Sequence, residues 1–278
     1  MVYVANMKKG LFVLLAALAA EASAQTGVLR DYIDEYGINH GKGIVIAEVA
    51  WAPVNCGYHE TMYPYGKLYQ WGRKTGQGYG CPDSRENPKG VAEYADTKGA
   101  WVRFVEEPPV SVAAGQSKEC ADTFFYCDNR HHWFNWIDDD VVKWNAGNPY
   151  DPAKNQPDDP CPKGWRVPTP EELQWLTKNH PVYGAADFEQ YDKDEKGRYG
   201  VWFSGFEPYS ENVPRLFLLL AGMREYSGAH SLDREAAGHY WGSCYGYKVE
   251  FSRRAKVIEH SDAYPAEGCS VRCVQEDY

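Results

Sequence analysis

The sequence lacks any apolar segment long enough to cross a lipid bilayer, since a transmembrane helix needs about 20 apolar residues. The runs over residues 11–20 and 216–221 both fall well short. Positive charge is also scarce, with 29 basic against 39 acidic residues and a formal net charge of −10. Because an acidic protein repels phosphate backbones, we expect no nucleic-acid partner. Internal repeats and low-complexity tracts are absent too, and the length fits one large domain or two small ones.

The N-terminus has the order of features of a secretory signal peptide. A basic pair, Lys8 and Lys9, precedes the apolar run over residues 11–20, and the small residues Ala-Ser-Ala follow at 22–24. The alternative is a membrane anchor, which the short run disfavours. No cysteine adjoins the cleavage point, so a lipid anchor is not expected. We expect cleavage of residues 1–24, export to the periplasm, outer-membrane surface or extracellular space, and no transmembrane segment in the mature chain.

The sequence also lacks a CxxC pair, and no histidine stands at zinc-ligand spacing, which argues against a zinc site. The even number of cysteines, eight, behind an export signal instead indicates disulfides formed in an oxidising compartment. Their spacing alone leaves the pairing open. The eight are Cys56, Cys81, Cys120, Cys127, Cys161, Cys244, Cys269 and Cys273.

Apolar periodicity predicts a helix over residues 28–36 that ends at Gly37, so residues 25–43 form an N-terminal helix and linker. Residues 44–278 form the main domain, which begins with a buried strand over residues 44–51.

The clearest helix start lies at residues 169–172, where Thr-Pro-Glu-Glu forms a capping box. Leu173 and Leu176 then give the helix an inward face, and Pro181 ends it. Short strands are expected beyond it. Few helices, several short strands and many loops predict an α+β domain with a small antiparallel sheet. The expected strands cover residues 200–204, 215–221, 240–243, 247–251 and 270–274.

Four blocks of sequence resemble the Fibrobacter succinogenes major paralogous domain. They are WAPVN at 51–55 with YGKLYQWGRK at 65–74, DPCPKGWRVPT at 159–169, YWGS at 240–243, and CSVRCV at 269–274. The blocks stand in the family's order and span nearly all of residues 50–274.

The resemblance implies a C-type-lectin-like fold, a compact unit whose ends meet, similar to that of formylglycine-generating enzymes. It also implies a secreted or surface protein of a Bacteroidota-type cell envelope, adhesin-like or an accessory subunit. The expected partner is a protein or glycan at the cell surface, including an outer-membrane or fimbrial complex. Trp51, Trp71 and Trp165 lie inside the family blocks, and we interpret them as core residues.

The resemblance further implies that Cys161 and Cys273 form the disulfide that closes the domain. The remaining cysteines then pair most economically as Cys56 with Cys81, Cys120 with Cys127, and Cys244 with Cys269. Because Cys269 lies only four residues before Cys273, these two cysteines could exchange roles.

Formylglycine-generating enzymes use a copper-binding pair of cysteines close in sequence. Cys244 has no second cysteine at short range, and only His239 lies near it as a base. We therefore expect no enzymatic activity and no cofactor. The alternatives are an oxidoreductase related to those enzymes and a purely structural subunit.

Oxygen-rich stretches at residues 138–140 and 151–159 leave a structural calcium ion open as an alternative to a solvated acidic surface, which we favour. The sugar-binding calcium motifs of C-type lectins are not matched, because Glu207-Pro208-Tyr209 lacks the amide and Trp144-Asn145-Ala146 lacks the acid.

Aromatic and cationic residues gather in the last third of the chain, between the expected short strands. Rings of this kind stack on sugars and dominate protein-binding hot spots. The predicted ligand-binding residues are Arg224, Tyr226, His230, Tyr240, Tyr245 and Tyr247.

Overall fold

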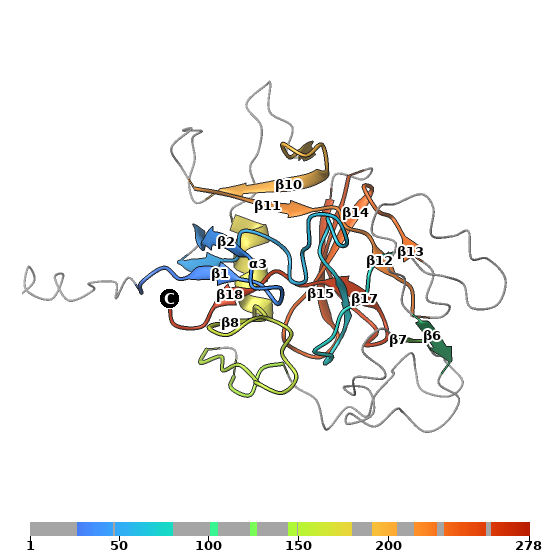
Figure 1. The fold of residues 1–278 in the computed structure, drawn as a ribbon, viewed down its shortest axis with the longest axis horizontal. Coiled ribbons are helices and arrows are strands. Elements are labelled where there is room, and N and C mark those ends of the chain that lie inside the picture. Colours follow the sequence, from blue (N-terminus) through green and yellow to red (C-terminus); the bar gives the residue numbers. More distant parts are fainter. Residues whose placement is uncertain are drawn as a thin grey trace, which may run out of the picture.

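The computed structural model describes residues 27–46, 48–79, 101–104, 123–126, 144–148, 150–179, 191–204, 214–226, 231–253 and 257–278. Within these ranges the chain is mostly short β-strands in small, largely antiparallel sheets, with one α-helix (Figure 1). The predicted signal peptide, Cys81, Cys120, Cys127 and His230 lie outside the described residues.

The largest sheet has the order β13-β12-β17-β14-β15-β16, and β5 also pairs with β17. β17 runs antiparallel to β12 and β5 but parallel to β14, so a strand from the chain end completes the centre of the sheet. The strands are β5 (Leu68–Gln70), β12 (Met223–Arg224), β13 (Ser231–Leu232), β14 (Ala237–Trp241), β15 (Tyr247–Ser252), β16 (Val257–Asp262) and β17 (Gly268–Ser270).

A second sheet, of order β3-β4-β18-β8, brings the two ends of the main domain together. Its strands are β3 (Ile44–Ile46), β4 (Val49–Trp51), β8 (Trp165–Arg166) and β18 (Val274–Gln275). The last strand, β18, pairs with both β4 and β8.

The Cys161–Cys273 disulfide reinforces this closure across 112 residues, which confirms that predicted pair. A link of this span stabilises the fold by up to about 4.7 kcal/mol in the chain-entropy model.

Three smaller sheets complete the described part of the chain. β9 (Tyr191–Lys193), β10 (Tyr199–Ser204) and β11 (Arg215–Leu219) form an antiparallel sheet. β1 (Asp31–Ile33) and β2 (Asn39–Lys42) form a hairpin. β6 (Trp101–Phe104) and β7 (Thr123–Tyr126) form a parallel pair.

The helix predicted over residues 28–36 is wrong, because these residues enter the β1–β2 hairpin. The Asp34 carboxylate accepts hydrogen bonds from the backbone N–H groups of Tyr36 and Ile38, both at 2.9 Å. Such local side-chain bonds offer the backbone an alternative to a helix. Gly37 then adopts a φ of 78°, which the turn requires. Burial of Tyr32 between exposed neighbours follows the period of a strand.

Two of the predicted strands are interrupted. Residues 44–51 form β3 and β4 with a tight turn between them, in which Glu48 has a φ of 61°. Likewise, residues 270–274 divide between the end of β17 and the start of β18. The other expected strands, over residues 200–204, 215–221, 240–243 and 247–251, correspond to β10, β11, β14 and β15 with shifts at their ends.

The predicted capping box is confirmed at the start of helix α3 (Pro170–Asn179). The Thr169 N–H donates to Glu172 Oε2 at 2.8 Å, and the Glu172 N–H donates to Thr169 Oγ1 at 3.2 Å. Leu173 and Leu176 are fully buried, as their spacing predicted, whereas Trp175 faces outward. The predicted stop at Pro181 lies outside the described residues.

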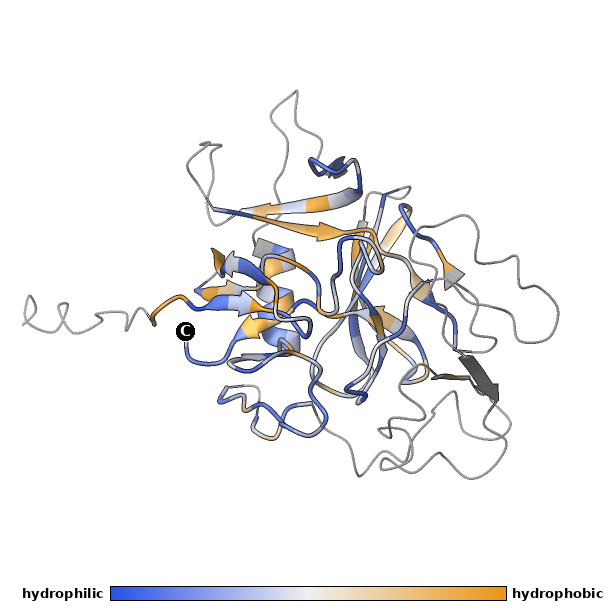
Figure 2. Cartoon of the chain, viewed as in Figure 1, coloured by the Kyte–Doolittle hydropathy of each residue, from blue (hydrophilic) through white to orange (hydrophobic). Residues whose placement is uncertain are grey.

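Two cores lie on opposite faces of β14, a strand buried along its whole length. Successive side chains of a strand point to opposite faces, so Tyr240 and Trp241 enter different cores. Apolar residues colour much of β11 and alternate with polar residues on α3 (Figure 2).

We call the first the aliphatic core: Ile46, Trp51, Leu173, Leu176, Val201, Phe203, Leu216, Leu218, Leu220, Tyr240, Val249, Phe251 and Val274. We call the second the sulfur–aromatic core: Tyr32, Ala52, Cys56, Tyr69, Trp71, Phe125, Trp144, Cys161, Trp165, Val167, Met223, Trp241, Ala263, Ala266, Cys269, Val271 and Cys273. Trp51, Trp71 and Trp165 are all buried in these cores, as predicted.

Candidate functional site

Two of the predicted ligand-binding residues are core residues, and their assignment to an accessible site is wrong. Arg224 is 0% exposed, and its Nε donates to the Gly78 carbonyl at 3.0 Å while its guanidinium lies over the Phe124 ring. Tyr240 is also 0% exposed, and its hydroxyl donates to the Leu219 carbonyl at 2.9 Å. Both side chains are buried because they lie on short strands at the centre of the largest sheet, not in loops.

Tyr247 is partly buried at the start of β15, where it packs against the aliphatic core. Burial raises its pKa to about 12, although a hydrogen bond with Gln174 of helix α3 partly opposes this effect. Its ring therefore belongs to the junction between α3 and the sheet.

Tyr226 and Tyr245 remain accessible, and the structure adds a third residue, Tyr264. Tyr245 is 48% exposed and meets the Trp71 ring edge to face at 5.1 Å. Tyr264 is 42% exposed, and its ring contacts that of the partly buried Tyr226 at 4.5 Å. Tyr264 was not among the predicted ligand-binding residues, because it lies beyond the segment with the densest aromatic residues. We call Tyr226, Tyr245 and Tyr264 the tyrosine surface.

Backbone hydrogen bonds bring the loops of this surface to one turn, residues 263–267. The Ala263 N–H donates to the Gly246 carbonyl at 2.7 Å, which ties the turn to the loop that carries Tyr245. The Trp71 N–H donates to the Pro265 carbonyl at 3.1 Å. The positions of the rings are therefore set by backbone contacts as well as by packing.

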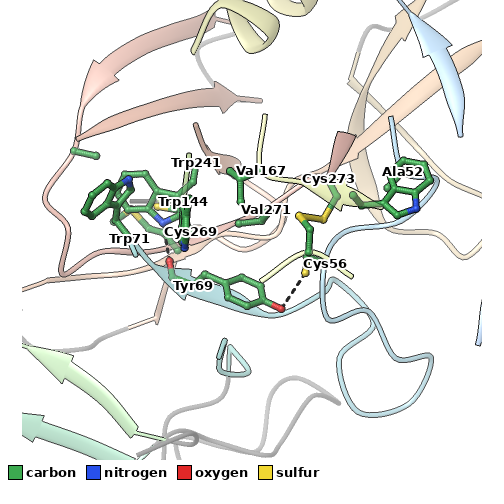
Figure 3. Close-up of a cluster of buried hydrophobic side chains, with 14 of the residues drawn as sticks. Ala52, Cys56, Tyr69, Trp71, Trp144, Val167, Trp241, Cys269, Val271 and Cys273 are labelled. Atoms are coloured by element: carbon green, nitrogen blue, oxygen red, sulfur yellow. Dashed lines mark hydrogen bonds between the residues drawn. A yellow bond between two sulfur atoms is a disulfide. The ribbon is translucent and has the colours of Figure 1, made fainter. Parts of the chain in front are cut away.

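A cluster of three buried tryptophans, whose rings are tilted or edge-on to one another, packs against Tyr245 through Trp71. Figure 3 shows these three tryptophans side by side. The Trp144 ring lies between those of Trp71 and Trp241, at 6.1 and 6.5 Å. Trp241 is fixed in turn, because its Nε1–H donates to the Tyr69 carbonyl at 2.6 Å. A rigid support lowers the entropy cost of holding a surface ring in place for a ligand.

Charged and polar residues lie buried on the same face of the largest sheet as Trp241. Lys248 and Glu267 form an ion pair at 2.7 Å with both side chains less than a tenth exposed. Near them, His239 Nδ1 lies 3.4 Å from Glu250 Oε2, but neither ring nitrogen has a hydrogen-bond partner among the described residues. Burial, assisted by Lys248, lowers the pKa of His239 to about 3, so its ring is neutral at pH 7.

The predicted Cys244–Cys269 disulfide is wrong, since both cysteines carry free thiols. Cys269 lies on β17 and is fully buried in the sulfur–aromatic core, whereas Cys244 lies partly exposed in the turn after β14. Burial raises the pKa of both thiols; nearby acidic groups add to the effect, and at Cys269 the Lys248 charge partly opposes it. Both thiols are therefore protonated at neutral pH, which is unfavourable for a nucleophile.

Cys56 is also a free thiol, so the predicted link to Cys81 is wrong as well. Its side chain points into the sulfur–aromatic core, and its Sγ lies within 4.8 Å of the sulfurs of Cys161 and Cys273. Three cysteines so placed could hold a metal ion only as thiolates, but two of them form a disulfide.

Residues 151–159, one of the two oxygen-rich stretches considered as a calcium site, include a carboxylate that stabilises the fold. Asp159 is fully buried and accepts hydrogen bonds from the backbone N–H groups of Cys161 and Val167, at 2.8 and 2.9 Å. Its burial raises its pKa to about 6, although Lys154 at 3.4 Å opposes this effect. Residues 138–140 lie outside the described residues.

Comparisons with protein-family models, curated proteins and solved structures found no match to this chain. Within the described ranges, no helix is long and apolar enough to cross a membrane.

Proposed function

We propose that this chain is an exported, noncatalytic binding or assembly protein of a Bacteroidota-type cell envelope. Its tyrosine surface would contact a protein or glycan at the cell surface, in the manner of an adhesin. The observation that carries the proposal is the grouping of two exposed tyrosines and the partly buried Tyr226 around one turn, next to a fixed cluster of tryptophans. Tyrosine anchors of this kind bring large contact area at low entropy cost.

The proposal takes the domain to have a C-type-lectin-like fold of the Fibrobacter succinogenes major paralogous family. Its support is the order of the four sequence blocks, together with the return of the last strand beside the first strands of the main domain. The confirmed Cys161–Cys273 pair also agrees with that assignment.

Binding is favoured over the alternative, a formylglycine-generating-type oxidoreductase, by the state of the cysteines. Such chemistry needs two reactive thiols that bind copper together. Here Cys269 is fully buried in the core, Cys244 is only partly exposed, and burial raises the pKa of both. A purely structural subunit is the second alternative, and the exposure of Tyr245 and Tyr264 favours ligand contact over it.

The test measures binding to isolated native cell-envelope fractions and to a panel of immobilised cell-surface glycans. Replacing Tyr226, Tyr245 and Tyr264 together by alanine should weaken the strongest interaction at least tenfold, because hot-spot tyrosines each contribute about 2 kcal/mol or more. The matched control is Tyr150→Ala, since Tyr150 is 94% exposed in a separate loop. Unchanged affinity in the triple variant, with an unchanged melting temperature, would exclude this surface.

A further inference from the structure

The free thiol of Cys56 lies against the disulfide that closes the domain. The three sulfurs of Cys56, Cys161 and Cys273 lie within 4.8 Å of one another, and all three residues are buried (Figure 3). Neither ligand binding by the tyrosine surface nor the fold requires a free thiol beside the Cys161–Cys273 disulfide. The Cys56 thiol therefore needs a separate explanation.

Backbone contacts hold Cys56 in this place. Its N–H donates to the Val271 carbonyl at 2.9 Å, and nearby the Ala52 N–H donates to the Cys273 carbonyl at the same distance. The Cys56 thiol donates to the Pro160 carbonyl at 3.3 Å, and Pro160 directly precedes Cys161. The segment that carries Cys56 is therefore bound to both segments that carry the disulfide.

We propose that Cys56 is a second disulfide partner of Cys161, so that the domain closes through either Cys161–Cys273 or Cys56–Cys161. The two forms interconvert by intramolecular thiol–disulfide exchange. The Cys56 thiolate attacks Cys161 Sγ, the Cys161–Cys273 bond breaks, and its electron pair stays on Cys273 Sγ. Cys273 takes up the proton that Cys56 lost, so the exchange needs no oxidant or reductant.

Two phenols flank the sulfurs and favour this direction of exchange. The Tyr69 hydroxyl donates to Cys56 Sγ at 3.3 Å, and this bond helps to hold the attacking sulfur (Figure 3). The Tyr32 hydroxyl lies 3.8 Å from Cys273 Sγ, where it can donate to the thiolate that leaves. A leaving thiolate that is hydrogen-bonded leaves faster.

The same surroundings keep the exchange slow at neutral pH. Burial, assisted by the nearby Glu35 and Asp159, raises the pKa of Cys56 to about 12, although hydrogen bonds with Tyr69 and Tyr32 partly oppose this effect. Only the thiolate attacks a disulfide, so at pH values below that pKa the exchange rate should rise about tenfold for each unit by which the pH increases. After exchange, the C-terminal residues 273–278 no longer have a disulfide to Cys161. Cys161 remains in a disulfide, now with Cys56.

Trypsin separates the three cysteines, which makes peptide mapping a direct test. Cys56, Cys161 and Cys273 fall alone in the peptides 43–67, 155–163 and 273–278, and cleavage after Arg272 removes Cys269 from the last of these. Oxidised, folded protein is quenched in acid, unfolded in denaturant and alkylated with a thiol reagent that reacts at mildly acidic pH, so that no free thiol can exchange during digestion. It is then digested without reduction and mapped by mass spectrometry.

The decisive variant is Cys273→Ser, which should yield the 43–67 peptide linked to the 155–163 peptide. The matched Cys56→Ser variant should yield only the 155–163 peptide linked to 273–278. Alkylation of both Cys56 and Cys161 in folded Cys273→Ser protein, or a link from Cys161 to another cysteine, would overturn the proposal.

A second measurement on the unmodified chain covers the case in which the variant fails to fold. Protein is held at pH 7 or at pH 10 and quenched with acid before mapping. The Cys56–Cys161 link should appear at pH 10 at least a hundredfold faster than at pH 7, and never in Cys56→Ser protein. Its absence at both pH values would overturn the proposal.

Discussion

The two larger cores within the described residues stabilise one sheet by different means. The aliphatic core is built from strands and from helix α3, whose side chains recur with regular period, and it consists mainly of leucine, valine, isoleucine and phenylalanine. The sulfur–aromatic core is built largely from loops, and its tryptophans, tyrosines and cysteines are positioned by individual hydrogen bonds and ring contacts. The strands and helix α3 around the aliphatic core, which we call the regular half, form the scaffold of the domain. The loops around the sulfur–aromatic core, which we call the irregular half, carry the tyrosine surface and the neighbouring sulfurs of Cys56, Cys161 and Cys273.

Arg272 joins the two halves, and its loss should have the largest effect. The fully buried guanidinium donates to the Ala52 carbonyl, to Asn55 Oδ1 and to the Phe217 carbonyl of β11, each at 2.9 Å. Replacing Arg272 by leucine removes all three bonds, and of the three acceptors only Asn55 Oδ1 keeps another donor among the described residues, the Tyr240 hydroxyl at 3.3 Å. We therefore expect a loss of roughly 4 kcal/mol in the free energy of unfolding. Urea denaturation measures the loss, and Arg30→Ala, at an exposed arginine, should change it by less than about 0.5 kcal/mol. A loss below about 1 kcal/mol for Arg272→Leu would show that the two cores are not joined through this residue.

A cavity in the aliphatic core should be the next largest effect. Leu173→Ala removes a fully buried side chain from α3, and we expect a loss of about 3 kcal/mol. Trp175→Ala, on the exposed side of the same helix, should cost less than about 0.5 kcal/mol. If the halves are distinct as described, Leu173→Ala should leave the ring contacts beneath the tyrosine surface intact, and the near-ultraviolet circular dichroism of the tryptophan cluster reports these contacts. A spectrum that changes as much as that of unfolded protein would contradict the division.

The sequence predicted the regular half better than the irregular half, for physical reasons. The capping box at Thr169 and the inward spacing of Leu173 and Leu176 are local signals, and the structure bears them out. By contrast, Tyr32 belongs to a hairpin because Asp34 organises the turn through its side chain, a contact that apolar spacing does not report.

The candidate site shows the same limit. Arg224 is buried because β17 and β12 pair across a long separation in the chain, and Tyr264 reaches Tyr226 through the same pairing. The free state of Cys56 was not predicted, because Cys56 was paired with Cys81, the cysteine nearest to it in sequence. The fold instead places Cys56 beside Cys161. Each of these facts depends on contacts between residues far apart in sequence.

The buried histidine of the irregular half should make that half sensitive to acid. The pKa of His239 is about 3 in the folded protein, below its ordinary value of about 6.5 in an unfolded chain. Between these values the unfolded state binds more protons, so stability is lost as pH falls below about 6.5. His239→Phe should remove this loss, which amounts to about 2 kcal/mol between pH 7 and pH 5. Denaturation of both proteins at the two pH values measures the difference. An equal change in both would place the acid sensitivity elsewhere.

The helix cap lies where the two halves meet, and its loss should have the smallest effect of the four. Glu172 accepts from the Thr169 N–H and from both terminal nitrogens of Arg166, which belongs to β8, and the Ser243 N–H donates to the Pro168 carbonyl at 2.7 Å. Thr169→Ala removes only the hydroxyl acceptor of the Glu172 N–H, so we expect a loss of about 1 kcal/mol.

Thr169→Ser keeps that acceptor and serves as the matched control, with a loss below about 0.5 kcal/mol. Ser243 directly precedes the turn that carries Tyr245. Ligand binding by the Thr169→Ala and Thr169→Ser proteins therefore also tests whether the helix cap positions the tyrosine surface. The Pro168 carbonyl, not the Thr169 hydroxyl, makes the contact with Ser243. Ligand binding by folded Thr169→Ala protein should therefore equal that of the unmodified chain, even though its midpoint of urea denaturation falls. Weaker binding that Thr169→Ser does not share would mean that the helix start positions the tyrosine surface, and that the regular and irregular halves are coupled at this junction.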